Sequence, residues 1–195
     1  MPRAGLTPGL LLDAAARIAD ADGLPAATLA RLAAELGVRP PSLYKHVDGL
    51  DAIHRGLALR GLKEATARCQ RATVGKAREA ALFAFAHAYW QFARERPGLY
   101  AASVRAAKPG ENDIAAAGEA LIGVVLAVLS GYGVAGNDAL HATRGLRAII
   151  HGFVSLDAMG AFRLKLDLAE SFDRVLGAFA GDLAARGAAA AEPER

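Results

Sequence analysis

The sequence predicts an all-α protein in which an N-terminal helix-turn-helix unit precedes a larger helical body, with about nine helices in total. Apolar residues recur at helical spacing through nearly the whole chain, and no strand-like alternation of any length occurs. Alanine is abundant, and aromatic residues make up only 6% of the 195 residues. This composition favours helix because alanine loses no side-chain entropy there.

The N-terminal helices have recognisable ends. Thr7 is expected to cap a helix over 8–21, and Asp22-Gly23 ends it. Thr28 is expected to cap a second helix over 29–36, and Gly37 can take the left-handed conformation that a sharp exit requires. Pro40 and Pro41 can open a third helix to about His46, since the first turn needs no amide donors. Two short helices around a glycine turn indicate a helix-turn-helix, whose second helix enters the DNA major groove.

The rest of the chain is expected to form six longer or shorter helices. Val74-Gly75, Pro97-Gly98, Lys108-Pro109-Gly110 and 131–136 break the pattern. The expected helices lie over 48–71, 76–96, 99–106, 113–129, 139–159 and 167–185, with Asp48 as the cap of the first. We therefore expect a DNA-binding domain over 1–47, a helical domain over 48–186 in which 48–71 is a linking helix, and a disordered tail over 187–195.

Composition is that of an ordinary globular chain with enough apolar material for a core, at 53% hydrophobic and 22% charged residues. Cys69 is the only cysteine, so no intramolecular disulfide can form, which fits a reducing cytoplasm. Cys69 is either a small residue on a helix or a redox switch. No signal peptide is expected, because Asp13, Arg17 and Asp20 interrupt the first apolar stretch.

One uncharged stretch, over 120–136, is just short of a membrane span. Ser130, Gly131 and Gly133 interrupt it. We therefore interpret it as a buried helix that ends in a glycine-rich turn, and we expect no membrane partner.

Several side chains of the helix-turn-helix suit DNA. Arg39 can pair with guanine O6 and N7, and proline rings can contact a thymine methyl group. Hydroxyl, amine and imidazole groups can reach phosphates, and a helix N-terminus also suits one. Each residue has a structural alternative, as a cap, a core residue or a solvated charge. The candidates for DNA contact are Thr28, Arg39, Pro40, Pro41, Ser42, Tyr44, Lys45 and His46.

Charge alone would not reveal a DNA-binding module. Residues 1–59 carry six basic and six acidic residues, although the segment over 37–47 holds Arg39 and Lys45 and no acid. Residues 60–108 carry ten basic and three acidic residues. Electrostatics therefore permits DNA binding without demanding it.

The motifs resemble a known family. Leu32-Ala33, Gly37-Val38, the segment over 42–47 and the following 50–53 resemble the N-terminal domain of TetR-family transcriptional regulators over roughly 7–58. The segments over 90–100 and 151–162 resemble the family's C-terminal domain that is named for its Trp, His and Gly. One departure stands out, because many members carry a lysine near the position of Asp51. Arg55, Arg3 or the N-terminus could compensate for it.

The resemblance implies a homodimer built from the last two long helices of each subunit, in an all-helical ligand-binding and dimerisation domain. Glycines at positions 145 and 152 permit close helix approach. The partner would be double-stranded DNA with a palindromic operator, with half-sites about 34–36 Å apart or a multiple of this. The apolar stripes could instead build an intramolecular core. The residues expected at the dimer contact are Leu146, Ile149, Ile150, Phe153, Leu168, Phe172, Val175 and Phe179.

The resemblance also implies a small-molecule effector, which we expect to be mostly hydrophobic because few polar groups are available. Its binding would release a repressor from its operator by a shift in population. Aromatic residues at helical spacing are also ordinary core residues. The candidates for the ligand pocket are Phe83, His87, Trp90, Tyr100, His151 and Phe153.

Two alternatives remain: a constitutive DNA-binding protein without an effector, and an all-helical enzyme. The five histidines are scattered and form no metal-ligand motif. Ser155 and Asp157 near His151 share one expected helix and do not suggest a triad. No phosphate-binding glycine loop is present. We therefore expect no catalytic residues, no metal and no cofactor.

Overall fold

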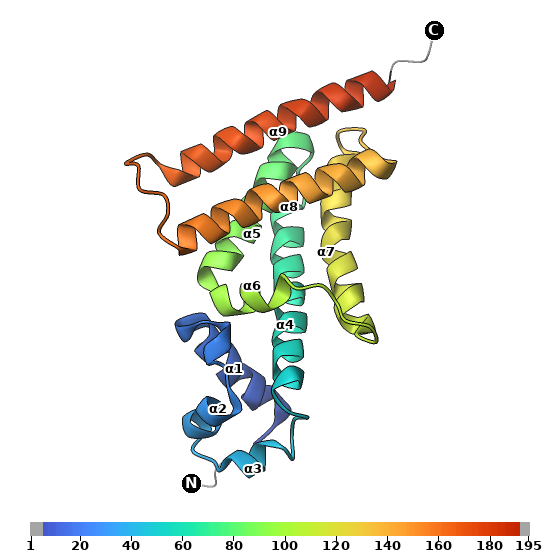
Figure 1. Ribbon diagram of the computed structural model, residues 1–195. Coiled ribbons are helices and arrows are strands. Elements are labelled where there is room, and N and C mark those ends of the chain that lie inside the picture. The colour runs from blue at the N-terminus through green and yellow to red at the C-terminus, as the bar shows by residue number, and fades with distance from the viewer. Residues whose placement is uncertain (1–5, 192–195) are drawn as a thin grey trace. The chain divides into compact units, whose positions relative to one another are not determined.

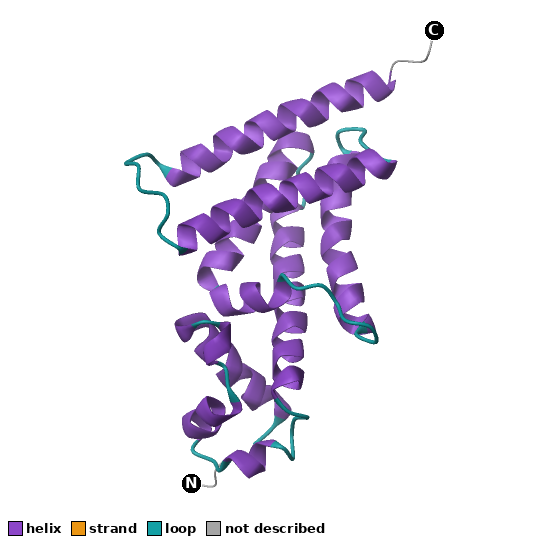
Figure 2. Cartoon of the chain, in the orientation of Figure 1, coloured by secondary structure: helices purple, strands orange, loops and turns teal. Residues whose placement is uncertain are grey.

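The chain folds into helices throughout the described part, residues 6–191 of the computed structural model (Figure 1). Within these residues the structure contains nine α-helices, one short 3-10 turn and no strand (Figure 2). The helices are α1 (Pro8–Asp22), α2 (Leu29–Leu36), α3 (Pro40–Leu43), α4 (Leu50–Thr73), α5 (Arg78–Glu95), α6 (Pro97–Ser103), α7 (Asn112–Ser130), α8 (Gly136–Ala158) and α9 (Leu168–Ala191), with the 3-10 turn at Leu24–Ala26.

The predicted ends of the first two helices are confirmed. The Thr7 hydroxyl accepts a hydrogen bond from the Leu10 amide at 3.2 Å, and the Thr28 hydroxyl accepts one from the Arg31 amide at the same distance. Each bond satisfies one of the amides that a helix N-terminus leaves without a partner.

Helix α3 is shorter than expected, because it ends at Leu43 rather than at His46. The amides of His46 and Val47 both bond to the Leu43 carbonyl, at 2.9 and 3.1 Å. The three-residue spacing of the His46 bond tightens the chain into a turn instead of continuing the helix.

Helix α9 is longer than expected, because it continues to Ala191. The expectation of a disordered tail from residue 187 is therefore wrong as far as Ala191, and its remainder lies outside the described residues. Gly187 does not stop the helix but lets α9 pass close to the α7–α8 turn. A Cβ there would collide with the Tyr132 carbonyl oxygen. The alanines that follow have the highest helix propensity of all residues.

The described chain divides into two compact units. The first comprises the residues up to Glu64 together with Glu95–Gly118, and the second comprises Ala65–Arg94 together with the residues from Glu119 onward. The expected boundary at residue 47 does not coincide with this division, because α6 and the beginnings of α4 and α7 belong to the same unit as α1–α3. The domain limits 1–47 and 48–186 stay a prediction about function.

The first unit is built on the contact between α1 and α6. Gly98 of α6 lies directly on the backbone of Ala19 of α1, where a Cβ would overlap the Ala19 carbonyl. Asp20 of α1 caps α6, since its Oδ1 accepts the amides of Gly98 and Leu99 at 2.9 and 3.2 Å. Its Oδ2 accepts Arg96 Nε at 2.7 Å, and Arg96 Nη1 also donates to Glu64 Oε2 of α4 at 2.9 Å.

The second unit has an aromatic core. Phe172 of α9 is fully buried, and its ring centroid lies 4.7 Å from that of Trp90 of α5 and 4.9 Å from that of Phe153 of α8. Aromatic rings at such separations stabilise a core beyond the area they bury. These contacts join α5 to the consecutive helices α8 and α9, which lie much later in the chain.

Cys69 lies in the interior of the second unit, on the last turns of α4. Its side chain is completely buried, and burial raises the pKa of the thiol to about 12. Because the thiolate is the reactive form, its fraction at neutral pH is negligible. The small-residue interpretation of Cys69 therefore fits the structure, and the redox switch does not.

Helix α7 is less buried than the sequence indicates. Within residues 6–191 it is the one helix that is long and apolar enough to cross a membrane by length and composition, with a mean hydropathy of 1.9 over its most apolar window. Core helices of globular proteins meet the same criterion, so this is weak evidence for a membrane span. Only 28% of that window is buried, so the expectation of a buried helix is wrong for much of α7.

The glycine at the α1–α6 contact gives a stability prediction. Gly98→Ala should lower the free energy of unfolding by about 1–3 kcal/mol, because the added methyl group meets backbone that cannot move aside easily. Gly118→Ala is the matched control, since nothing lies within 4 Å of a Cβ at Gly118 in α7. That substitution should raise stability by about 0.5–1 kcal/mol. Urea denaturation measures both, and equal effects of the two variants would contradict the close approach.

Candidate nucleic-acid interface

The helix-turn-helix consists of α2 and α3 joined by a turn at Gly37. Gly37 has φ 63° and ψ 33°, the left-handed conformation that glycine adopts without strain. Its neighbour Val38 donates its amide to the Ala33 carbonyl at 3.0 Å, which closes the end of α2. Arg39 is then extended and precedes Pro40 and Pro41 at the start of α3. The predicted helix–turn–helix geometry is confirmed.

One residue anchors α3 to its unit. Leu43 is fully buried, whereas its neighbour Tyr44 is 61% exposed. A large aromatic side chain that stands this far into solvent beside a buried leucine has no role in the core. Leu43 therefore fills the inner position of α3, and Tyr44 points outward.

Most of the candidates for DNA contact are exposed. Six of the eight are exposed, and the other two, Ser42 and His46, are half-buried. Thr28 also caps α2, so its hydroxyl already accepts the Arg31 amide. The exposed six are Thr28, Arg39, Pro40, Pro41, Tyr44 and Lys45.

The basic groups of this unit differ in their partners. Arg31 pairs with Asp22 at 3.0 Å and Arg17 with Glu35 at 3.7 Å. In the described part of the chain, neither Arg39 nor Lys45 pairs with a carboxylate. The charges of Arg39 and Lys45 are therefore available to a phosphate or to a guanine edge. The unpaired positive charge of this segment lies on the residues that flank α3.

A lysine that sequence reasoning did not single out lies near the same end of the unit. Lys108 Nζ, from the loop between α6 and α7, is 3.9 Å from Asp51 Oδ2 in the first turn of α4. Asp51 was noted as a departure from the family pattern, but its partner lies 57 positions later in the chain. No local sequence pattern links the two residues. Of the groups expected to compensate for Asp51, Arg55 pairs with Asp113, whereas Arg3 and the N-terminus lie outside the described residues.

Metal-binding clusters and candidate nucleophiles can be examined in the described part of the chain. Among the described residues, no group of three or more histidine, cysteine, aspartate or glutamate side chains could hold a metal ion. Ser155 Oγ is 3.4 Å from His151 Nε2, one helical turn away on α8. This is a long contact between side chains of one helix rather than an activated nucleophile.

Comparison with known proteins decides the family. Residues 11–47 match the model of bacterial regulatory proteins of the tetR family, and residues 82–179 match the tetracyclin repressor-like C-terminal domain. The chain belongs to the TetR family of transcriptional regulators. It is therefore a regulator with a DNA-binding domain, in a family whose members bind DNA and act as dimers.

Individual relatives agree. The HTH-type transcriptional regulator YobS of Bacillus subtilis (strain 168) is 39% identical over 170 residues, which is 87% of this chain and 88% of that protein. An HTH-type transcriptional regulator of Mycobacterium tuberculosis H37Rv is 34% identical over 77% of this chain and 69% of its own length. A solved structure of a protein of unknown function from Rhodococcus sp. RHA1 has a TM-score of 0.80 and 25% identity, with coverage of 94% and 98%.

The six candidates for the ligand pocket do not form one group in this TetR-family chain. Tyr100 is buried on α6 in the first unit, whereas the other five belong to the second unit. Trp90 and Phe153 pack around Phe172, so they fill space rather than line it. His87 Nε2 is 2.6 Å from Asp173 Oδ1 of α9, Phe83 lies beside His87, and His151 is exposed on α8. Their role in ligand binding stays a prediction.

The eight residues expected at the dimer contact differ in how far they are buried within the chain. Leu146, Ile150 and Phe172 are at most 1% exposed. The expectation is wrong for these three, because side chains enclosed within one chain cannot reach a partner. Val175 is 39% exposed, and the remaining four, Ile149, Phe153, Leu168 and Phe179, are half-buried.

Proposed function

We propose that this TetR-family regulator is a repressor that binds a palindromic operator through α3 and the residues on either side of it. The proposal rests on one observation: most side chains from Arg39 to Lys45 are exposed, whereas Leu43 among them is fully buried and holds α3 to its unit. Arg39 lies at the start of α3, where the first residues of a recognition helix meet base edges. Tyr44 and Lys45 follow at its end, where phosphate contacts fix register.

The operator can be obtained from a pool of random duplexes by selection with the purified protein. Lys45→Ala should then weaken binding to every duplex by a similar factor and lower the slope of log K against log salt by about one. Arg39→Ala should cost about 1–3 kcal/mol and relax the preference at one base position. Gel shifts at several salt concentrations measure both.

Three outcomes would count against this arrangement. An unchanged salt slope would remove Lys45 from the contacts. Equal losses on all sequences would make Arg39 a backbone contact. Transcription in vitro from a promoter that overlaps the selected operator tests repression directly, and a rise in transcript on adding the protein would make it an activator.

For the dimer, we infer a contact between the outer faces of α8 and α9 and those of a second copy. Leu140 and Val175 are exposed apolar side chains on these helices, at 50% and 39%. Gly181 on α9 has nothing within 4 Å of a Cβ position, which leaves room for close approach of a neighbouring helix. Dimeric symmetry would place two α3 helices on the two halves of a palindrome.

Val175→Glu should convert the dimer to a monomer, because a charge without a partner would be buried at the contact. Leu10→Glu is the control, since Leu10 on α1 has a similar exposure of 41%. Sedimentation velocity measures the oligomeric state, with circular dichroism to check that both variants fold. A dimer that survives Val175→Glu would place the contact elsewhere.

For the effector, we infer a groove on the second unit rather than the aromatic core. Its volume is about 690 Å³, within the range of small-molecule sites. Small residues of α7 form one wall and the α4–α5 turn forms the other, and Lys76 and Arg78 are among the lining residues. An apolar molecule with an anionic group fits this lining. Its binding and that of DNA would weaken each other by the same factor.

The dye 8-anilinonaphthalene-1-sulfonate is a probe of this chemistry. Gly123→Leu should abolish most of its fluorescence enhancement, because Gly123 lines the groove and nothing lies within 4 Å of its Cβ position. Gly118→Leu, on the same helix but outside the groove lining, should leave the enhancement unchanged. Equal fluorescence of the two variants would exclude the groove and favour the alternative of a regulator without an effector.

A further inference from the structure

The loop between α6 and α7 is held in place by a carboxylate at its centre. Arg105 donates a hydrogen bond to Glu111 from each of its two terminal guanidinium nitrogens, Nη1 to Oε2 at 2.6 Å and Nη2 to Oε1 at 2.8 Å. Glu111 Oε2 also accepts the backbone amide of Lys108 at 2.8 Å, and the Glu111 amide donates to the Lys108 carbonyl at 3.0 Å. The side chain of Arg105 thus lowers the pKa of Glu111 to about 2, with the Lys108 amide as the second cause.

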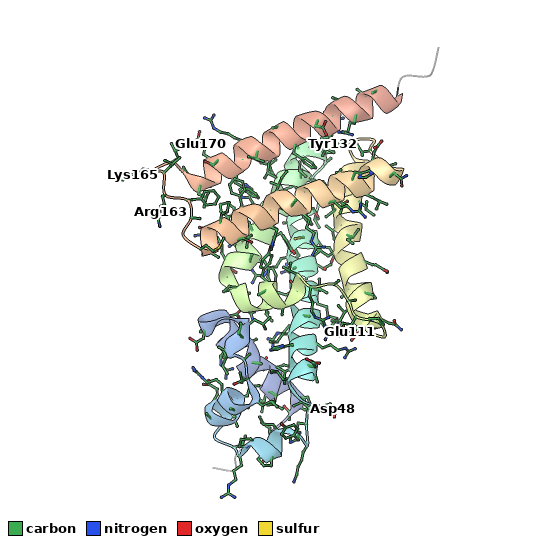
Figure 3. The ribbon with its side chains drawn as sticks, in the orientation of Figure 1. Asp48, Glu111, Tyr132, Arg163, Lys165 and Glu170 are labelled. Atoms are coloured by element: carbon green, nitrogen blue, oxygen red, sulfur yellow. The ribbon has the colours of Figure 1, made fainter. Side chains whose placement is uncertain are left out.

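The same loop is tied to α4. Asp113, in the first turn of α7, accepts Arg55 Nη2 of α4 at 2.5 Å. The position of the Lys108 backbone is therefore fixed from both sides, by Glu111 and through Asp113. Figure 3 labels Glu111 in this loop and Asp48 just ahead of α4. All of these residues belong to the first unit.

The side chain of Lys108 extends from this fixed position toward the beginning of α4. Its Nζ lies 3.9 Å from Asp51 Oδ2, and the two side chains are 65% and 91% exposed. An exposed pair of this kind contributes little to stability. A rigid loop that carries an exposed ammonium group to one place is better explained by a partner outside the chain.

That partner can be inferred from the charges around α3. Asp51 follows Lys45 by only six residues, and in Figure 1 α3 and the beginning of α4 lie at the same end of the first unit. The carboxylates of Asp48 and Asp51 would repel a phosphate strand that runs past this end. Arg55, another basic residue near it, is already engaged with Asp113. Lys108 is the exposed cation that stands beside Asp51.

We propose that Lys108 is a DNA-backbone contact, delivered to the beginning of α4 by the α6–α7 loop and oriented by Asp51. It supplies from a distant part of the chain the positive charge that the start of α4 lacks. The inference rests on the proposed DNA face at α3. It extends the contact surface from α2 and α3 to a loop that follows α6.

The test measures binding to a duplex of mixed sequence between about 50 and 200 mM salt, because phosphate contacts do not depend on sequence. Lys108→Ala should lower the salt slope by about 0.9, which corresponds to an affinity loss of about eightfold at 0.1 M salt. Lys63→Ala is the matched control, an exposed lysine of the same unit further along α4. It should leave the slope unchanged. Lys45→Ala reports on the proposed DNA face.

Repeating the measurement in the Asp51→Asn protein distinguishes a direct contact of Lys108 with DNA from neutralisation of the Asp51 charge by Lys108. A direct contact predicts that Lys108→Ala lowers the slope equally in the unchanged protein and in the Asp51→Asn protein. If the loss vanishes in the Asp51→Asn protein, Lys108 only neutralises Asp51 and the inference is wrong. If Lys45→Ala lowers the slope and Lys108→Ala does not, the inference fails while the proposed DNA face stands. If neither does, the DNA face itself is wrong.

Discussion

The close contact between α1 and α6 is the constraint on which the first unit depends. Gly98 lets α6 lie on the backbone of α1, and Asp20 binds the amides that begin α6. The position of α1 in turn sets that of α2 and α3, because these helices form one small core around Leu11, Leu32 and Leu43. Arg96 adds Glu64 of α4 to the same junction. Helices from before and after the long α4 are thereby held in one body.

This junction also explains why the sequence predicts the helices better than the units. Caps and glycine turns are local, so Thr7, Thr28 and Gly37 could be placed from neighbouring residues alone. Asp20 and Gly98 are 78 positions apart in the chain. No local sequence pattern around either residue predicts their contact. Gly98 after a proline was expected to end a helix, whereas its main consequence is the close approach of two helices.

The candidate site divides in the same way. The exposed face of α3 can be inferred from two neighbouring residues, because Leu43 is suited to the core and Tyr44 next to it then points outward. The aromatic stripes of the body do not reveal whether a ring faces a cavity, a partner or the core, because all three environments favour the same residues. Phe172 was assigned to the dimer contact and belongs to the core. The Lys108–Asp51 pair and the groove beside Gly123 arise only when distant helices are brought together.

The balanced charge of residues 1–59 has a consequence for how strongly DNA binding depends on salt concentration. Acidic neighbours already occupy Arg17 and Arg31, so few cations remain to displace counterions from DNA. If each subunit of the proposed dimer makes three phosphate contacts, the complex makes six, and its affinity falls about 1,800-fold between 50 and 200 mM salt, near the lower end of the 10³–10⁵-fold range for six to ten contacts. The proposed dimer would therefore lose its operator less steeply, as the salt concentration rises, than a repressor with a more basic DNA-binding unit.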